Sequence, residues 1–352
     1  MLSRVRTRIS PAACVTILLI TAVSGLLYVK WLPYAHRAAT AYTTHSIGHS
    51  ILTAGGVQAP PASLRSAIDY AVAYGKAIWQ AMVLGLLLGS ALQELAPPTL
   101  IPGLLGRPGW RGVVAGTLLS VPGMMCTCCA APVVIGLRRE NASAPSAIAF
   151  WLGNTVLNPA TLIFTGFVLG WQWTALRLLF GFLMIIAVTS VVGRLGQDEE
   201  LPREAVAQPA HTEGFHPTIT GWLARFLRLA LGLIPEYLII VLVLGAARVW
   251  LFPQIGPAVN NSIVWVVAMA AAGLIFVIPT AGEVPIVQAM LALGVGAGPA
   301  AALLLTLPPV SLPSIAMTKS VFSSRVLALV AGTILVVGIA AGFAAVAFRF
   351  HG

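Results

Sequence analysis

Long apolar stretches separated by short polar segments dominate this chain of 352 residues. Stretches of about 17–25 apolar residues, enough to cross a bilayer as one helix, recur along it. The predicted full spans, about seven in number, are Ala12–Trp31, Ile68–Leu92, Pro145–Leu169, Leu176–Gly193, Phe226–Leu251, Pro299–Met317 and Val326–Phe348. Two further apolar segments, Gly112–Leu137 and Ser262–Leu293, are broken by proline and glycine. The pattern predicts an all-α polytopic membrane protein.

The two broken segments are predicted to be re-entrant hairpins. The arms of the first, Gly112–Val121 and Ala130–Leu137, rise about 15 Å or less, half of the roughly 30 Å apolar core. With a cytoplasmic amino terminus, this topology places most basic residues next to the spans in the cytoplasm, as the positive-inside rule requires. The first arm of the second segment, Ser262–Ile278, is long enough to cross almost completely, so a full span stays open there.

The prolines indicate an internal repeat. The matching positions are Val121-Pro122, Pro132, Pro145 and Asn158-Pro159 in the first half, and Ile278-Pro279, Pro285, Pro299 and Leu312-Pro313 in the second. With the hairpin topology the halves run in opposite directions. Such inverted repeats are typical of secondary transporters, which bind cargo where broken helices meet at the repeat interface.

The chain divides into two predicted repeats with flanking parts. Residues 1–67 are a signal-anchor helix and an outer loop, because the apolar run after Arg8 is too long for a cleaved signal peptide. Residues 68–193 form the repeat with the cysteine-rich hairpin, and residues 222–352 form the repeat with the glutamate-containing hairpin. Residues 194–221, rich in charge and proline, are predicted to be a cytoplasmic linker.

Composition narrows the class of function. Hydrophobic residues make up 58% of the chain and charged residues 9%, against roughly 25% charged in soluble proteins. The net charge of +10 does not indicate nucleic-acid binding, because the cations lie in loops beside spans. The chain has no P-loop motif, nucleophile–base pair or carboxylate dyad, so we expect neither an enzyme nor a cofactor. The predicted location is a bacterial inner membrane, and a homo-oligomer stays open.

Three of the four cysteines, Cys126, Cys128 and Cys129, fall within four residues at a proline-broken turn. In extended backbone Cys126 and Cys128 point the same way, whereas on a helix Cys126 and Cys129 share a face. Either geometry presents a dithiol, which favours soft acceptors such as copper(I), zinc or a trivalent arsenical. The alternative is that the cysteines are small buried hydrophobic residues.

Three other polar residues are candidate site residues. Glu283 lies in the second break, where an isolated carboxylate is costly, so it is either a proton-coupling group or a cap on a half-helix predicted to begin at Pro285. Asn154 and Asn158 lie one helical turn apart. They are predicted either to line the pathway for cargo or to hydrogen-bond the broken backbone.

Two pairs of residues give weaker signals. Lys76 and Glu236 fall at equivalent repeat positions, which suggests a salt bridge between the repeats, although each could instead reach water from a span end. His45 and His49 have helical spacing, but without further ligands they do not predict a metal site.

The motifs around the breaks resemble those of the predicted-permease family that contains the ArsP-type organoarsenical efflux permeases. The resemblance rests on Pro122, Cys126-Thr127-Cys128, Pro132, Pro145–Phe150 and Leu157-Asn158-Pro159, and on Pro279–Pro285 and Leu312-Pro313-Ser314. It implies export of trivalent methylated arsenicals, with membrane cysteines as ligands and an ion gradient as the driving force. Where that family usually has Cys-Ser-Cys-Gly, Cys129 replaces the glycine.

The primary prediction is a secondary permease exporting a soft metalloid or organometalloid, most specifically methylarsenite. A permease for a sulfur-containing solute or another soft metal stays open. So does a transmembrane thiol–disulfide relay, although the second half contributes no cysteine to it.

Overall fold

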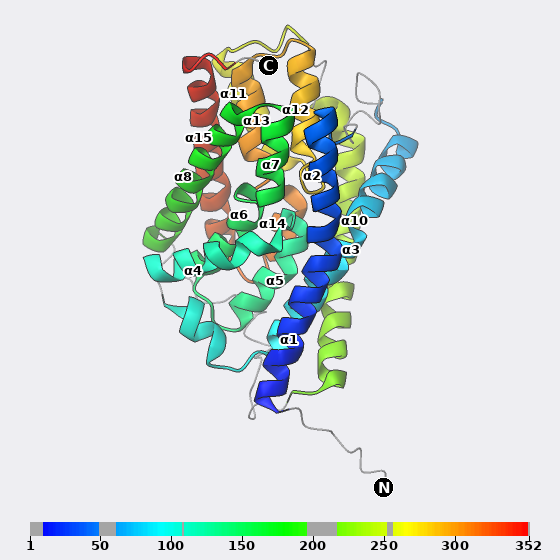
Figure 1. The fold of residues 1–352 in the computed structure, drawn as a ribbon, viewed down its shortest axis with the longest axis vertical. Helices are drawn as coiled ribbons and strands as arrows, with labels where there is room; N and C mark the ends of the chain where they lie inside the picture. The colour runs from blue at the N-terminus through cyan, green and yellow to red at the C-terminus, as the bar shows by residue number, and fades with distance from the viewer. Residues whose placement is uncertain (1–9, 49–60, 108, 196–216, 252–255, 351–352) are drawn as a thin grey trace.

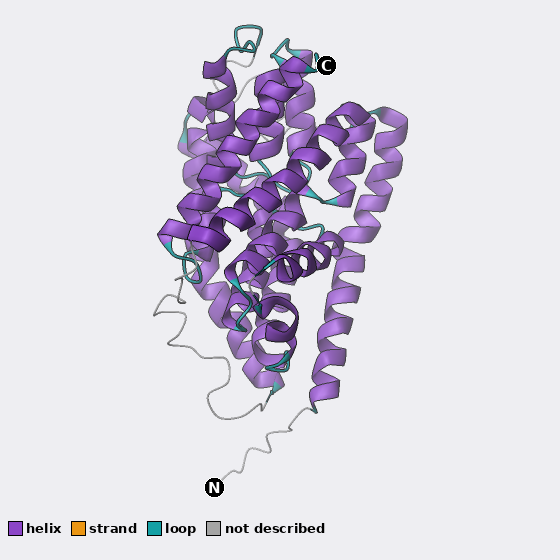
Figure 2. Cartoon of the chain, turned by 90° about the vertical axis from the view of Figure 1, so that its left-hand side faces the viewer, coloured by secondary structure: helices purple, strands orange, loops and turns teal. Residues whose placement is uncertain are grey.

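The computed structural model describes residues 10–48, 61–107, 109–195, 217–251 and 256–350, and over these the molecule is a bundle of helices without strands (Figures 1 and 2). Six helical segments are apolar and long enough to cross a membrane: Pro11–Thr44, Leu64–Leu95, Ala144–Val168, Trp171–Leu195, Ile219–Arg248 and Ser324–Ala347. The all-helical class is confirmed, and each of these segments corresponds to a predicted span, although Ala144–Val168 consists of two helices, Ala144–Val156 and Pro159–Val168.

The predicted full span Pro299–Met317 is not a single helix. The structure divides it into α13 (Ala297–Thr306) and α14 (Leu312–Thr318). Pro308 and Pro309 lie between the two helices. Proline has no backbone N–H and disfavours helical backbone in the residue before it, so one helix cannot run through this pair.

The first span continues beyond Trp31, where the sequence pattern ends it. α1 (Pro11–Leu26) leads through the π-helical turn η1 (Leu27–Trp31) into α2 (Leu32–Thr44). The combined helix lies along one side of the bundle (blue in Figure 1). Lys30 therefore lies inside a helix, in a π-helical turn, a feature often found at functional sites.

The remaining helices form two series with the same order. Each series has a long helix, two pairs of short helices and a second long helix. The first comprises α3 (Leu64–Leu95), α4 (Trp110–Ser120), α5 (Thr127–Arg139), α6 (Ala144–Val156), α7 (Pro159–Val168) and α8 (Trp171–Leu195), with the short turns η2 (Pro102–Gly106) and η3 (Val121–Gly123). The second comprises α10 (Ile219–Leu251), α11 (Ile263–Ile275), α12 (Glu283–Ala292), α13, α14 and α15 (Ser324–Ala347). Most of the predicted linker, residues 194–221, lies outside the described residues.

Two glycines bring α3 against α5. A Cβ atom on Gly85 would overlap the carbonyl oxygen of Cys129, and one on Gly89 would overlap that of Pro132. Glycines four residues apart form a flat face on a membrane helix, and this face lets two backbones approach closely. The cysteine-bearing end of α5 is thus positioned directly by the backbone of α3.

Candidate functional site

Cys126 lies in the turn that joins α4 to α5. Pro122 is in the short helical turn η3 that follows α4. The backbone is left-handed at Met124, with φ of 45°, and extended at Cys126, with φ of −74° and ψ of 165°. Cys126 is therefore the N-cap of α5, and the thiol cluster sits where a new helix begins.

The cluster consists of one close thiol pair and one separate thiol. The sulfurs of Cys126 and Cys129 lie 2.9 Å apart. The Cys128 sulfur lies 3.7 Å from the Ser311 hydroxyl, at the start of α14. All three cysteines are buried and are free thiols. Of the two predicted dithiol geometries, the structure therefore has the helical one, which joins Cys126 to Cys129.

Side chains from α6 hold the broken backbone in place. The Oδ1 atom of Asn154 accepts a hydrogen bond from the Met125 N–H at 3.4 Å. The Trp151 indole N–H donates to the Thr127 carbonyl at 3.1 Å. Backbone groups in an apolar layer must be satisfied inside the protein. Of the two roles predicted for Asn154, its contacts match hydrogen bonding to the broken backbone.

The second break has its own supports and ends at Glu283. Between α11 and α12, the Tyr70 hydroxyl donates to the Val277 carbonyl at 2.5 Å and the Tyr74 hydroxyl donates to the Ile278 carbonyl at 3.4 Å. Glu283 is the first residue of α12, so this helix begins two residues before the predicted start at Pro285. A carboxylate in the first turn is stabilised by the helix dipole.

Glu283 forms a buried ion pair that the sequence analysis missed. Its Oε1 atom lies 2.7 Å from Nη1 of Arg177, with side-chain exposures of 2% and 1%. Arg177, on α8, also donates to the Thr155 carbonyl at 3.0 Å. The signal was present in the sequence, because an arginine inside an apolar span is rare and usually has a buried partner.

The structure brings residues from both breaks together at one small cavity. Cys126, Asn158 and Glu283 line a space of about 10 Å³, which is about the size that one water occupies. The Asn158 Oδ1 atom caps α7 by accepting from the Thr161 N–H at 3.2 Å. Its amide nitrogen is buried without a hydrogen-bond partner in the described part of the protein. Asn158 therefore combines a structural contact with a donor that is available at the cavity.

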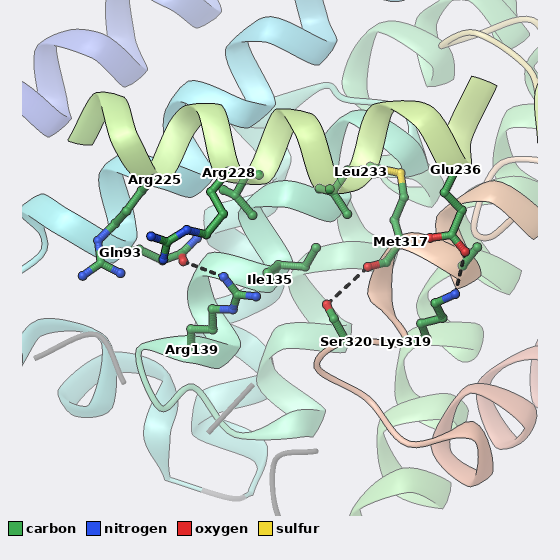
Figure 3. A pocket seen from close by; sticks show the side chains of 13 residues that line it. Gln93, Ile135, Arg139, Arg225, Arg228, Leu233, Glu236, Met317, Lys319 and Ser320 are labelled. Carbon is green, nitrogen blue, oxygen red and sulfur yellow. Dashed lines mark hydrogen bonds and ion pairs between the residues drawn. The ribbon is translucent and has the colours of Figure 1, made fainter. Parts of the chain in front are cut away.

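The predicted salt bridge between Lys76 and Glu236 is wrong. Glu236 pairs instead with Lys319, at 2.6 Å, as the dashed line in Figure 3 shows. Lys76 is exposed on α3. Both partners of the observed pair are partly exposed, and an ion pair in water contributes little to stability. The structure does not test the pair of His45 and His49, because His49 lies outside the described residues.

The six membrane-length segments indicate a multi-pass membrane protein, and broken helices with buried ionisable groups are typical of transporters. The chain belongs to the ArsP_1 family of predicted permeases, whose model matches residues 63–346. This membership confirms the resemblance seen in the motifs and indicates a transporter rather than an enzyme.

One curated relative is similar over nearly its whole length. The chain is 48% identical, over 331 residues, to the UPF0718 protein YraQ of Escherichia coli (strain K12), covering 93% of each chain. No solved structure is significantly similar to the chain.

Proposed function

We propose that this protein is a secondary-active permease of the bacterial inner membrane that exports a soft, thiol-reactive metalloid, most specifically a trivalent organoarsenical such as methylarsenite. The observation that carries the proposal is the pair of Cys126 and Cys129 sulfurs, 2.9 Å apart at a helix break. Two thiols at this separation suit one soft centre. Each arsenic–oxygen bond is replaced by an arsenic–sulfur bond, and the hydroxyl leaves as water with the thiol proton.

The two series of helices are proposed to be an inverted repeat, with a cytoplasmic amino terminus and α4–α5 and α11–α12 as re-entrant hairpins. Their common order of elements supports this arrangement. So does the length of the arms, since the 11 residues of α4 rise about 16 Å, well short of the roughly 30 Å core. Alternating access would then expose the thiols to one side of the membrane at a time.

Glu283 is proposed to couple transport to a proton gradient. Protonating its carboxylate removes the charge that holds Arg177, so the pair can separate when the halves move. Cys126 and Glu283 line the same small cavity, and this proximity supports a coupling group next to the proposed cargo site.

Serine substitution at Cys126 and Cys129 is expected to abolish protection against methylarsenite, because a hydroxyl is a hard and weak ligand for arsenic. The measurement is growth of an arsenic-sensitive strain that expresses each variant in methylarsenite. Cys14→Ser is the matched control, since Cys14 is also buried and free but lies on α1. Equal growth with the wild type and the double serine variant would contradict the thiol mechanism. Wild-type cells that grow no better than empty-vector cells would contradict the cargo.

Asn158→Ser is expected to leave stability nearly unchanged while lowering transport by about tenfold. Serine is as good an N-cap as asparagine, but it removes the unpaired amide donor at the small cavity, and a lost hydrogen bond to cargo costs up to about 1.5 kcal/mol. Asn158→Ala should lose about 1 kcal/mol of stability as well, through the cap. Thermal unfolding of the purified variants, together with vesicle uptake, separates the two effects. Full transport by Asn158→Ser would assign the residue a structural role alone.

A thiol–disulfide relay is the second candidate, because Cys126 and Cys129 form a C-x-x-C pair at the start of a helix, the arrangement of many redox-active thiols. It requires a partner thiol that exchanges with the pair. Trapping a mixed disulfide with a second protein would favour the relay over the permease.

A further inference from the structure

A buried lysine near the thiols has no carboxylate partner among the residues that the structure describes. Lys30 is 4% exposed, donates to the Thr280 hydroxyl at 3.1 Å, and lies over the ring of Tyr34 at 5.3 Å from its centroid. No carboxylate in the described part of the chain forms an ion pair with it. Burying an ammonium without a counter-ion is costly. The positive-inside rule concerns residues in loops and so does not account for a lysine inside a helix.

Lys30 and Cys126 line the same cavity. This space has a volume of about 400 Å³ and lies between the helix of Lys30, α3 and the second break. Arg37 and Thr280 also contribute to its lining, and among the described residues no aspartate or glutamate does. The cavity therefore offers an ammonium group, a hydroxyl and a thiol, without a carboxylate that would repel an anion.

A second cavity, of about 250 Å³, lies at the other end of α5 and is also positively charged. Cys126 caps the start of α5 and Arg139 ends it, about 20 Å further along the axis. The charged residues around this cavity are four cations and one acid: Arg139, Arg225, Arg228, Lys319 and Glu236 (Figure 3). Positive charge thus flanks the thiols at both ends of the helix that carries them, a distribution that raises the local concentration of anions.

We propose that Lys30 and Cys126 form a subsite for a small anion with a soft centre, in which the ammonium holds the negative charge and the thiol contacts the soft atom. The inference rests on the proposed function, because it uses one of the same thiols, and it goes beyond that function by giving the site an anionic cargo in place of neutral methylarsenite. The class includes thio-anions, whose terminal sulfur accepts a weak hydrogen bond from the thiol, and complexes of a trivalent metalloid with a carboxylate-bearing thiol, whose soft centre the thiol can bind. Neutral cargo would leave Lys30 without a counter-ion.

The test measures how fast neutral iodoacetamide alkylates Cys126 in the full-length protein in nanodiscs, with tandem mass spectrometry to assign the site. Thiosulfate is the soft anion, and sulfate is a hard anion of the same charge. We expect thiosulfate to protect Cys126 in the wild type and in Lys30→Arg. Lys30→Gln should raise the half-protecting concentration by at least about tenfold, the effect of losing one charged hydrogen bond.

Two further variants make the test specific. Lys76→Gln removes an exposed lysine of α3 that does not line the cavity. Thiosulfate should protect Cys126 in this variant as it does in the wild type. Arg37→Gln removes an exposed cation that does line it. This variant should fold normally and raise the half-protecting concentration by about threefold, the smaller effect of a charge in water. If Lys30→Gln fails to fold, an unchanged half-protecting concentration of thiosulfate in Arg37→Gln overturns the subsite.

The remaining outcomes are distinct. Equal protection of the wild type and Lys30→Gln overturns the subsite, and protection by sulfate as strong as by thiosulfate overturns the soft centre. Methylarsenite is run in parallel as a neutral probe. If it fails to protect the thiols while thiosulfate succeeds in a Lys30-dependent way, the proposed cargo is wrong and the anion subsite is supported.

Discussion

Gly85→Ala is expected to destabilise the protein by about 3 kcal/mol or more and to abolish transport. A Cβ atom at this position would overlap the carbonyl oxygen of Cys129. That oxygen is backbone near the start of α5 and cannot rotate away, so the helix must shift. Overpacking in a tight core costs about 1–3 kcal/mol and more where the backbone has to move. The shift would also displace the Cys126 and Cys129 sulfurs from their close approach.

Gly75→Ala provides the matched control on the same helix. Nothing lies within 4 Å of a Cβ atom built at Gly75, and alanine favours helix over glycine by up to about 1 kcal/mol. This variant should therefore be as stable as the wild type or slightly more stable. Thermal unfolding of the purified proteins and iodoacetamide labelling of the thiols are the two measurements. If Gly85→Ala unfolds and labels as Gly75→Ala does, close packing of α3 on α5 does not position the cluster.

Hydrophobic length was the most reliable guide to the fold. It identified the segments that the structure shows as six membrane-length helices, because crossing an apolar layer fixes both the length and the composition of a helix. It failed at Pro299–Met317, where a window of apolar residues conceals Pro308 and Pro309. The predicted span Pro145–Leu169 likewise contains a break, since α6 ends at Val156 and α7 begins at Pro159.

The sequence indicates the candidate site residues one by one, but it does not indicate how they pair. Cysteine spacing indicated a dithiol, yet only the backbone at Cys126 decides that Cys129 rather than Cys128 is the near partner. Glu283 was visible as a rare acid in an apolar segment. Its partner, Arg177, is 106 residues earlier, as the two residue numbers show, and no local pattern joins residues that far apart. Lys30 was missed for another reason. The predicted span ends at Trp31, so Lys30 was expected at the end of a span and not inside a longer helix.

Breaking the ion pair between Arg177 and Glu283 is the second change that we expect to destabilise the protein strongly. Nη1 of Arg177 and Oε1 of Glu283 lie 2.7 Å apart, and both side chains are almost fully buried. Arg177→Met leaves a buried carboxylate alone, and Glu283→Gln leaves a buried guanidinium alone. Each single change should cost about 3–5 kcal/mol, the usual consequence of stranding a buried charge. The double variant should recover most of this loss, since it strands neither charge. Thermal unfolding of the three proteins, arranged as a double-mutant cycle, measures the recovery.

Transport should not recover with stability if Glu283 carries the coupling proton. The double variant is then a folded protein without a titratable group at the second break, and vesicles containing it should show no proton-driven accumulation of cargo. The pair formed by Glu236 and Lys319 is the control, because its distance is a similar 2.6 Å but its side chains are 35% and 62% exposed. Glu236→Gln should cost no more than about 1 kcal/mol and should leave transport intact. Proton-driven transport by the double variant at the wild-type rate would remove Glu283 from the coupling step, and the ion pair would then be purely structural.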